Sequence, residues 1–177
     1  MFFILIGGLL VAVSAGAIAS LPYRFAKKPV PRGLMPIVGG VSLLIFVLWN
    51  DYSWYGRTVA ELPERVAVVE SFTYSGALQP WTLIKPRINR FTAVDRASIQ
   101  RNEALPGYVM ADIIFVQRYQ PTLQARQIFD CADTRRADLT DSTEFDERGM
   151  PQNVNWVDLE DDHPLIPIVC AEPAPIG

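Results

Sequence analysis

The sequence predicts a membrane-anchored α+β protein, with a transmembrane hairpin of two helices over residues 1–50 and a mainly antiparallel β domain over residues 51–177. Two long runs near the start contain no charged side chain, and the later part alternates strand-forming runs with turn residues. Charge divides the chain at the same place. Residues 1–50 hold four basic residues and no acid, whereas residues 51–177 hold twelve basic and nineteen acidic residues, a formal charge of −7. A boundary near residue 50 therefore separates a lipid-facing part from a water-facing part.

The first apolar run, from Phe2 to Leu21, has only Ser14 and Ser20 as polar side chains. At about 1.5 Å per residue, its helix spans a hydrocarbon core of about 30 Å. A cleaved signal peptide is the alternative. It requires positive charge before the apolar run, and here only Met1 precedes it. We therefore expect a retained helix.

The second apolar run, from Leu34 to Trp49, is shorter, and Pro36 lies where a first helical turn tolerates proline. Extension back to Pro31 or on to Tyr52 gives it enough length to cross. Small residues recur on both runs, at Gly8, Ala12, Gly16, Ser20, Gly39 and Gly40. Such residues let helices approach closely, either within the hairpin or against a partner protein. We expect the first use.

The orientation follows from the basic residues between the two runs, which are Arg24, Lys27, Lys28 and Arg32. Cytoplasmic loops carry the excess of Lys and Arg, so we expect this connection to be cytoplasmic and the N-terminus and large domain to face outward. The second run is followed by a cluster of interfacial aromatics, Trp49, Tyr52, Trp54 and Tyr55. We interpret this cluster as an aromatic belt at the outward-facing surface of the membrane that the two helices cross. The alternative is that these side chains belong to the soluble core.

Near the start of the β domain, Thr58–Glu64 could begin or end a short helix, which Pro63 limits. Val66–Tyr74 is rich in β-branched and aromatic residues and predicts a strand. Pro80–Asp95 is mixed, and its Pro86 must lie at an edge or a bulge because proline donates no ladder hydrogen bond.

The strongest predicted pair of strands is Tyr108–Tyr119 with Leu123–Asp130, joined by a turn at residues 120–122. Apolar and polar residues alternate in the second of these, which suits a sheet with one wet face. Leu165–Cys170 predicts a last short strand. The acidic segment Asp138–Asp162, which contains Trp156, predicts a long loop.

Cys131 and Cys170 are the only cysteines, and both lie in the domain expected to face outward. An isolated pair in an oxidising compartment usually forms a disulfide, which we expect here. Two buried thiols are the alternative if the domain is cytoplasmic. A redox-active pair is disfavoured because the CxxC spacing is absent.

Catalytic and cofactor signals are weak. The one histidine, His163, lies in an acidic segment, and no serine is marked as a nucleophile. With both cysteines bridged, one His or Cys ligand remains for a metal, and the acidic segment lacks the spacing of an EF-hand. We expect no cofactor, no metal and no enzymatic activity. The acidic net charge also argues against nucleic acid as a partner.

A basic stretch surrounds Trp81 and Phe91 and consists of Lys85, Arg87, Arg90, Arg96 and Arg101. These residues could contact acidic lipid headgroups or an acidic partner. They could equally pair with the acidic segment of the same domain, which is the expectation we adopt.

The runs WNDYSWYGRTVAELPERVAVVES, QPWTLIKPRINRFTAVD and FDCADTRRADL, with a later IVC, resemble a group of small, uncharacterised inner-membrane proteins of Gram-negative bacteria. The resemblance covers most of the chain. It implies two membrane helices, a periplasmic domain and localisation in the bacterial inner membrane. It brings no catalytic residues to this sequence.

Two functions are consistent with these features. The first is a non-catalytic accessory or assembly subunit of an inner-membrane complex, with lipid and a partner protein as its contacts. The alternative is an envelope-facing module that binds or senses a ligand. A deep pocket with convergent polar groups would favour the second function. An enzyme is the least favoured class because no catalytic constellation is visible.

Overall fold

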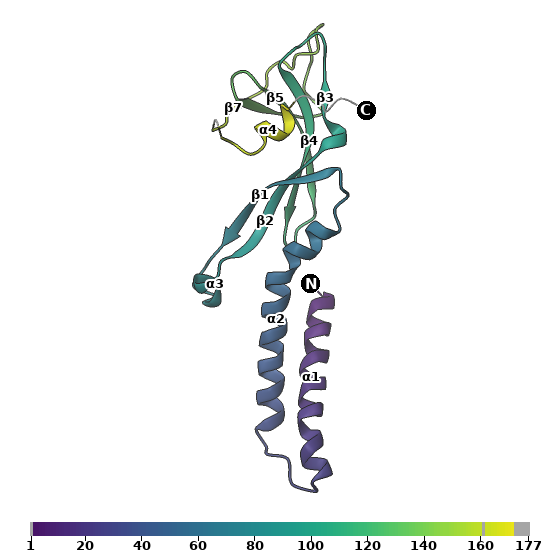
Figure 1. Ribbon diagram of the computed structural model, residues 1–177, viewed down its shortest axis with the longest axis vertical. Coiled ribbons are helices and arrows are strands. Elements are labelled where there is room, and N and C mark those ends of the chain that lie inside the picture. Colours follow the sequence, from purple (N-terminus) through teal and green to yellow (C-terminus); the bar gives the residue numbers. More distant parts are fainter. Residues whose placement is uncertain (1, 161, 172–177) are drawn as a thin grey trace. The chain divides into compact units, whose positions relative to one another are not determined.

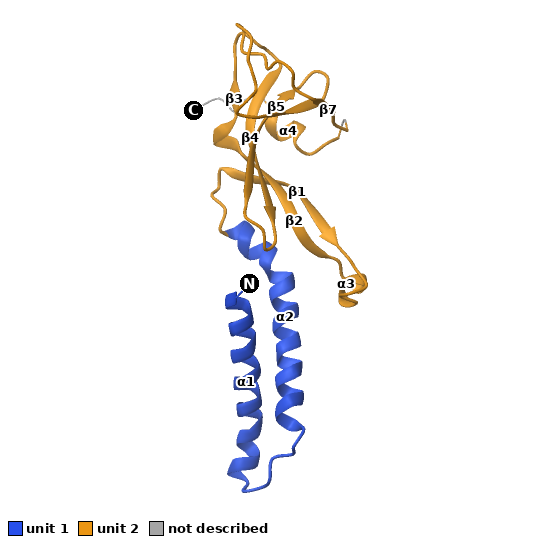
Figure 2. Cartoon of the chain, turned by 180° about the vertical axis from the view of Figure 1, so that it is seen from behind, with its two compact units in different colours: residues 1–60 blue, residues 61–177 orange. Residues whose placement is uncertain are grey.

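The computed structural model describes residues 2–160 and 162–171, which form two compact units (Figures 1 and 2). The first unit is a helical hairpin and the second is an antiparallel β domain, which confirms the predicted order of the two parts. The division lies after Ala60 rather than after residue 50. The second helix continues past residue 50 to Ala60, beyond the end of its apolar run at Trp49.

The hairpin consists of α1 (Phe2–Phe25) and α2 (Leu34–Ala60), and both helices extend beyond the apolar runs that predicted them. α1 includes Pro22 in its last turn. It is followed by Lys27 in a left-handed conformation with φ 51°, a common way for a helix to end. The 27 residues of α2 measure about 40 Å, about 10 Å more than a hydrocarbon core.

Small residues bring the two helices together. A Cβ atom added to Gly39 would lie 3.2 Å from the backbone oxygen of Ala12, and one added to Gly16 would lie 3.4 Å from that of Met35. Both distances mean that backbone of one helix faces backbone of the other. The predicted use of these residues within the hairpin is confirmed at both glycines. Gly40 differs, because nothing lies within 4 Å of its added Cβ.

The second unit is built on one sheet in the order β1-β2-β4-β5-β6-β7, with β3 paired to β4 outside this path. Every pairing is antiparallel, and Figure 1 shows the strands twisting and curling along the sheet. The strands are β1 (Val66–Tyr74), β2 (Arg87–Asp95), β3 (Gln100–Arg101), β4 (Tyr108–Gln117), β5 (Leu123–Asp130), β6 (Arg135–Leu139) and β7 (Trp156–Asp158).

The predicted strands Val66–Tyr74 and Leu123–Asp130 match β1 and β5 residue for residue. β4 ends two residues before the predicted Tyr119, because the backbone N–H of Gln120 donates to Gln117 O and Tyr119 adopts φ 64°. The expected alternation of buried and exposed residues along β5 is not observed, because three of its first four residues are exposed. Its last four residues are all buried, so both faces of the sheet are covered there.

The mixed segment Pro80–Asp95 resolves into α3 (Trp81–Ile84) followed by β2, and Pro86 lies just before the strand. A 3-10 turn, η1 (Arg96–Ser98), follows β2. The sequence analysis predicted neither β6 nor β7. β7 lies inside the segment that was expected to be a loop. Both strands are short and carry charged residues.

The prediction of a final strand over Leu165–Cys170 is wrong, because α4 (Ile166–Val169) forms a helical turn there. Pro167 lies at its start, where the missing N–H costs nothing and the fixed φ suits a helix. In a central strand the same proline would remove a ladder hydrogen bond.

The core of the second unit lies between α4 and one face of the sheet. Leu165 and Val169, at the two ends of α4, pack on buried side chains from three strands, namely Val94, Val109, Ala111, Ile113 and Phe129. A disulfide joins Cys170, directly after α4, to Cys131 at the end of β5, which confirms the predicted bridge. It closes a loop with a sequence separation of 39 residues. Packing and covalent bond therefore hold the same turn against the sheet.

Removal of this bridge by Cys131→Ser is expected to lower the free energy of unfolding of the β domain by about 4 kcal/mol, from the chain entropy of a loop this long. The measurement is chemical denaturation of the full-length protein in detergent, followed by near-ultraviolet circular dichroism. Cys170→Ser serves as the matched variant and should cost the same amount. Free thiols that react in the unreduced, denatured wild-type protein would contradict the bridge.

Candidate functional site

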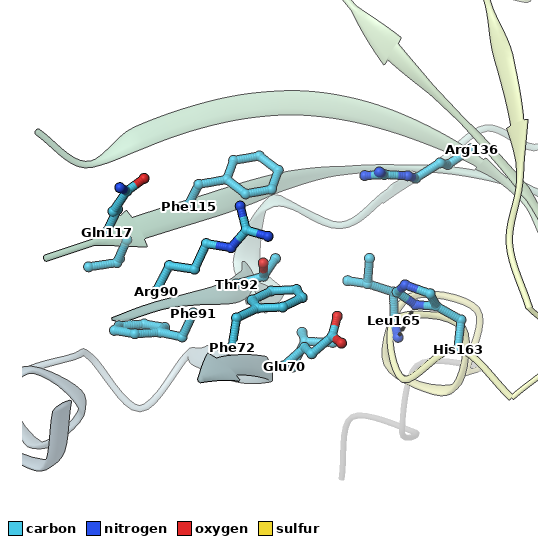
Figure 3. Close-up of a pocket in the computed structure, with 12 residues that line it drawn as sticks. Glu70, Phe72, Arg90, Phe91, Thr92, Phe115, Gln117, Arg136, His163 and Leu165 are labelled. Carbon is cyan, nitrogen blue, oxygen red and sulfur yellow. Dashed lines mark hydrogen bonds between the residues drawn. The ribbon is translucent and has the colours of Figure 1, made fainter. Parts of the chain in front are cut away.

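α4 covers only part of the sheet face that forms the core. Side chains alternate along a strand, so Thr92 shares a face with the core residue Val94, and Phe115 shares a face with Ile113. Beyond the edge of α4 this face opens into a cleft of about 420 Å³. His163 and Leu165 form one side of it, as Figure 3 shows. The cleft therefore continues the core face into solvent.

Charged groups of both signs line this cleft. Arg90 of β2 and Arg136 of β6 face it together with Glu70 of β1, and apolar contacts come from Phe72 and Phe115 (Figure 3). Sheet pairing is what assembles them, because these residues come from strands that are distant in the sequence. The formal balance of two guanidinium groups against one carboxylate gives the cleft a net positive charge.

The two arginines are held without an acidic partner. The guanidinium of Arg90 lies 4.5 Å from the centre of the Phe72 ring. Arg136 donates a hydrogen bond of 3.2 Å to the side-chain oxygen of Gln127. Within the described part of the chain neither makes an ion pair. Guanidinium groups in this state are well suited to bind a carboxylate or phosphate, which they can contact through two parallel hydrogen bonds.

His163 contributes a further donor. Its Nδ1 accepts a hydrogen bond of 3.2 Å from the backbone N–H of Leu165, so a neutral ring carries its proton on Nε2. This bond also fixes the ring beside the N-terminus of α4. Arg90, Arg136 and His163 thus offer N–H donors to the cleft, beside one carboxylate acceptor and an apolar floor.

Sequence reasoning found part of this cleft. Arg90 belongs to the basic stretch, and His163 was noted as the one histidine, but no signal pointed to Arg136 or Glu70. The expected pairing of the basic stretch with the acidic segment is not formed by Arg90, Arg96 or Arg101 in the described residues. Arg101 instead donates to backbone carbonyls near α4.

The other residues predicted to have a role lie in the hairpin unit. Arg24 is in the last turn of α1, and Lys27, Lys28 and Arg32 lie in the connection between the helices. The aromatic cluster Trp49, Tyr52, Trp54 and Tyr55 lies in the second half of α2, where the Arg57 guanidinium is 4.9 Å from the Trp49 ring. Their roles at a membrane remain predictions.

The acidic segment is folded by local hydrogen bonds. The Asp146 carboxylate accepts bonds of 2.9 Å from the N–H of Arg148 and 2.7 Å from that of Met150. In residues 2–160 and 162–171, the structure brings together no three His, Cys, Asp or Glu side chains that would hold a metal ion. Asp161 lies outside the described residues.

A second charged site lies at the turn between β5 and β6. Asp130 is buried and pairs with Arg135 at 2.7 Å, and its carboxylate also accepts from the N–H groups of Ala132 and Asp133. Burial alone raises the pKa of this carboxyl. The hydrogen bonds from Arg135, Asp133 and Ala132 outweigh that effect, so the pKa of Asp130 lies below its ordinary value. The pair therefore holds the turn that carries Cys131.

Asp130→Asn is expected to lower the free energy of unfolding by about 1–3 kcal/mol at neutral pH, because it removes charge-assisted hydrogen bonds from a buried group. A lowered folded-state pKa stabilises the protein above the unfolded value of about 3.9, and this contribution is lost as pH falls through the folded pKa. Denaturation at neutral and acidic pH measures both effects, and the gap between variant and wild type should shrink in acid.

The matched control is Asp133→Asn. Asp133 contacts the same Arg135 at 2.7 Å, but its side chain is 65% exposed. Its replacement should cost less than about 0.5 kcal/mol, because exposed ion pairs contribute little. An equal loss of unfolding free energy in both variants would contradict the assignment of this stabilisation to the buried Asp130 carboxylate.

Comparisons with protein-family models, with curated proteins and with solved structures found no match to this chain.

Proposed function

We propose that this chain is a non-catalytic binding module, anchored in the bacterial inner membrane, whose outward-facing domain binds an anionic ligand in the cleft beside α4. One observation carries the proposal. Arg90 and Arg136 face an open, partly apolar cleft without an acidic partner among the described residues. A ligand carboxylate or phosphate supplies the missing negative charge.

The hairpin supports anchoring in a membrane. By length and composition, α1 and α2 are able to cross one. The exposure of both helices also supports anchoring, because only 11% of the most apolar stretch of each helix is buried. A core helix of a water-soluble protein would bury most of such a surface, since exposed apolar area costs about 25 cal/mol per Å² in water.

Two separate features support the outward orientation of the β domain. The basic residues Arg24, Lys27, Lys28 and Arg32 lie in or beside the connection between the helices, which favours the cytoplasm for that connection. The bridge between Cys131 and Cys170 fits an oxidising compartment. In a Gram-negative cell, these features together favour a periplasmic β domain.

The composition of the cleft favours a small ligand with both acidic and apolar parts. Arg90 and Arg136 bind the acid, and the Nε2–H of His163 provides a further donor. Phe72 and Phe115 contact the apolar part. Glu70 gives selectivity, because it repels a second negative charge and accepts a hydrogen bond from a ligand donor.

A second candidate, an accessory or assembly subunit, is favoured by a different surface. An apolar groove of about 510 Å³ lies on the hairpin, between Ala12 and Gly16 of α1 and Gly39 and Gly40 of α2. In a bilayer such a groove accepts a helix of a partner protein, because small residues permit close packing. Gentle detergent extraction that yields this protein alone would count against this candidate.

Arg90→Gln and Arg136→Gln are each expected to weaken binding of the ligand by about tenfold or more, because each removes a charge-assisted contact. The measurement is calorimetric titration of the full-length protein in nanodiscs with a panel of carboxylates and phosphomonoesters. Arg96→Gln is the matched control, since this exposed arginine does not line the cleft. If no panel member binds, or if all three variants bind as the wild type does, the cleft is not an anion site.

The proposed topology is tested in spheroplasts. Added protease is expected to digest the β domain while the outer surface alone is accessible, and alkaline extraction should leave the protein in the membrane fraction. Lysed spheroplasts provide the control for protease access. Protection of the β domain in intact spheroplasts would reverse the orientation, and recovery in the aqueous fraction would exclude anchoring.

A further inference from the structure

The tip of the hairpin formed by β1 and β2, residues 75–86, is a folded element rather than an open loop. Its centre is Thr82, whose side chain is fully buried. The Thr82 hydroxyl donates to the carbonyl of Gln79 at 2.7 Å and accepts from the N–H of Gly76 at 3.0 Å. Thr82 lies within α3, a single turn closed by the bond from Lys85 N to Trp81 O. The hairpin tip therefore presents its side chains in a fixed arrangement.

This tip exposes large apolar side chains to solvent. Leu78 is 94% exposed and Ile84 is 90% exposed, the highest values for large apolar residues in the described part of the second unit. Leu83, beside Ile84 on α3, is 62% exposed. A fixed turn that exposes three aliphatic side chains indicates a surface that is covered by something else.

The charge around the tip is opposite to that of its domain. Residues 71–94 contain Lys85, Arg87 and Arg90 and no acidic residue, although the whole domain is acidic. The Arg87 guanidinium lies 5.6 Å from the ring of Tyr74, across the hairpin just behind the tip. An apolar end followed by basic side chains is complementary to a bilayer with anionic headgroups, whose acyl boundary lies behind a layer of phosphates.

We propose that the hairpin tip docks on an anionic lipid bilayer, with Leu78, Leu83 and Ile84 entering the headgroup region and Lys85 and Arg87 contacting lipid phosphates. Its small size favours lipid over protein. A stable protein interface covers about 800 Å² on each partner, far more than three aliphatic side chains provide. Lipid docking needs less area when the domain is already held near the surface.

The chain itself supplies that proximity if α2 spans the membrane. Only residues 61–65 separate the end of α2 from the first residue of β1. The docking site thus relies on the proposed anchoring, but none of its five docking residues lines the cleft. The cleft can fail as an anion site while the tip still binds lipid, so the two proposals are tested separately.

The test uses the full-length protein in liposomes. A Leu78→Cys variant is labelled with an environment-sensitive dye; the native cysteines are bridged and do not react. Val157→Cys on β7, at the opposite edge of the sheet and 45% exposed, is the matched control position. In vesicles containing phosphatidylglycerol, we expect the dye at 78 to be blue-shifted, quenched by nitroxide lipids and several-fold less quenched by iodide than the dye at 157.

Two substitutions should weaken docking and expose the dye at position 78 to water. Ile84→Ser removes apolar contact, and Lys85→Glu reverses a charge, so each should raise iodide quenching toward the value at 157. Vesicles of phosphatidylcholine alone should weaken docking in the same direction. The spectrum of the dye at 157 and the absence of free native thiols check that these variants are folded.

Three outcomes would overturn the proposal. Equal iodide quenching at 78 and 157 in phosphatidylglycerol vesicles would mean that the tip stays in water. Shielding that is present in native membranes but absent in liposomes would assign the tip to a partner protein. Shielding that increases with the ratio of protein to lipid would assign it to a second copy of this chain.

Discussion

The arrangement of the β domain depends on how α4 is fixed to the sheet. Seven antiparallel strands create more apolar face than they can bury by themselves, and a single turn of helix covers part of it. A turn of four residues has little stability alone. It remains in place because Leu165 and Val169 are buried and because Cys170 is bonded to Cys131. The cleft exists where this cover ends, so core and site are two parts of one surface.

The distribution of charge in the domain is organised by the same strands. Cations near the cleft come from β2 and β6, while acids are concentrated in the segment between β6 and α4. The ion pair of buried Asp130 with the partly exposed Arg135 lies at the turn between β5 and β6 and stabilises the position of Cys131. An acidic domain thereby retains a cleft with a local excess of positive charge, which is the basis of the proposed anion site.

The sequence predicted those elements whose signal is long or strongly periodic. Exclusion of charge over about twenty residues identified both helices, a β-branched run identified β1, and alternation after a turn identified β5. Short elements were missed for a physical reason. β6 carries two arginines and an aspartate on five residues, and an apolar run as short as that of α4 suits a strand or a helix equally well. Pro167 was the discriminating residue.

The cleft was less predictable than the fold. Glu70, Arg90 and Arg136 come together only after the register of several strand pairs is set, and no local pattern encodes that register. His163 reaches the cleft because of the turn that precedes α4. A single sequence contains these residues but does not show that they are neighbours.

The place of α4 in the chain has a consequence for biogenesis. It follows all seven strands in the chain, so the apolar face that α4 covers and the thiol of Cys131 lack their partners until α4 and Cys170 have been synthesised. During this interval the uncovered apolar face and the free thiol expose the domain to aggregation. Formation of the disulfide between Cys131 and Cys170 ends this interval and fixes α4 on the sheet.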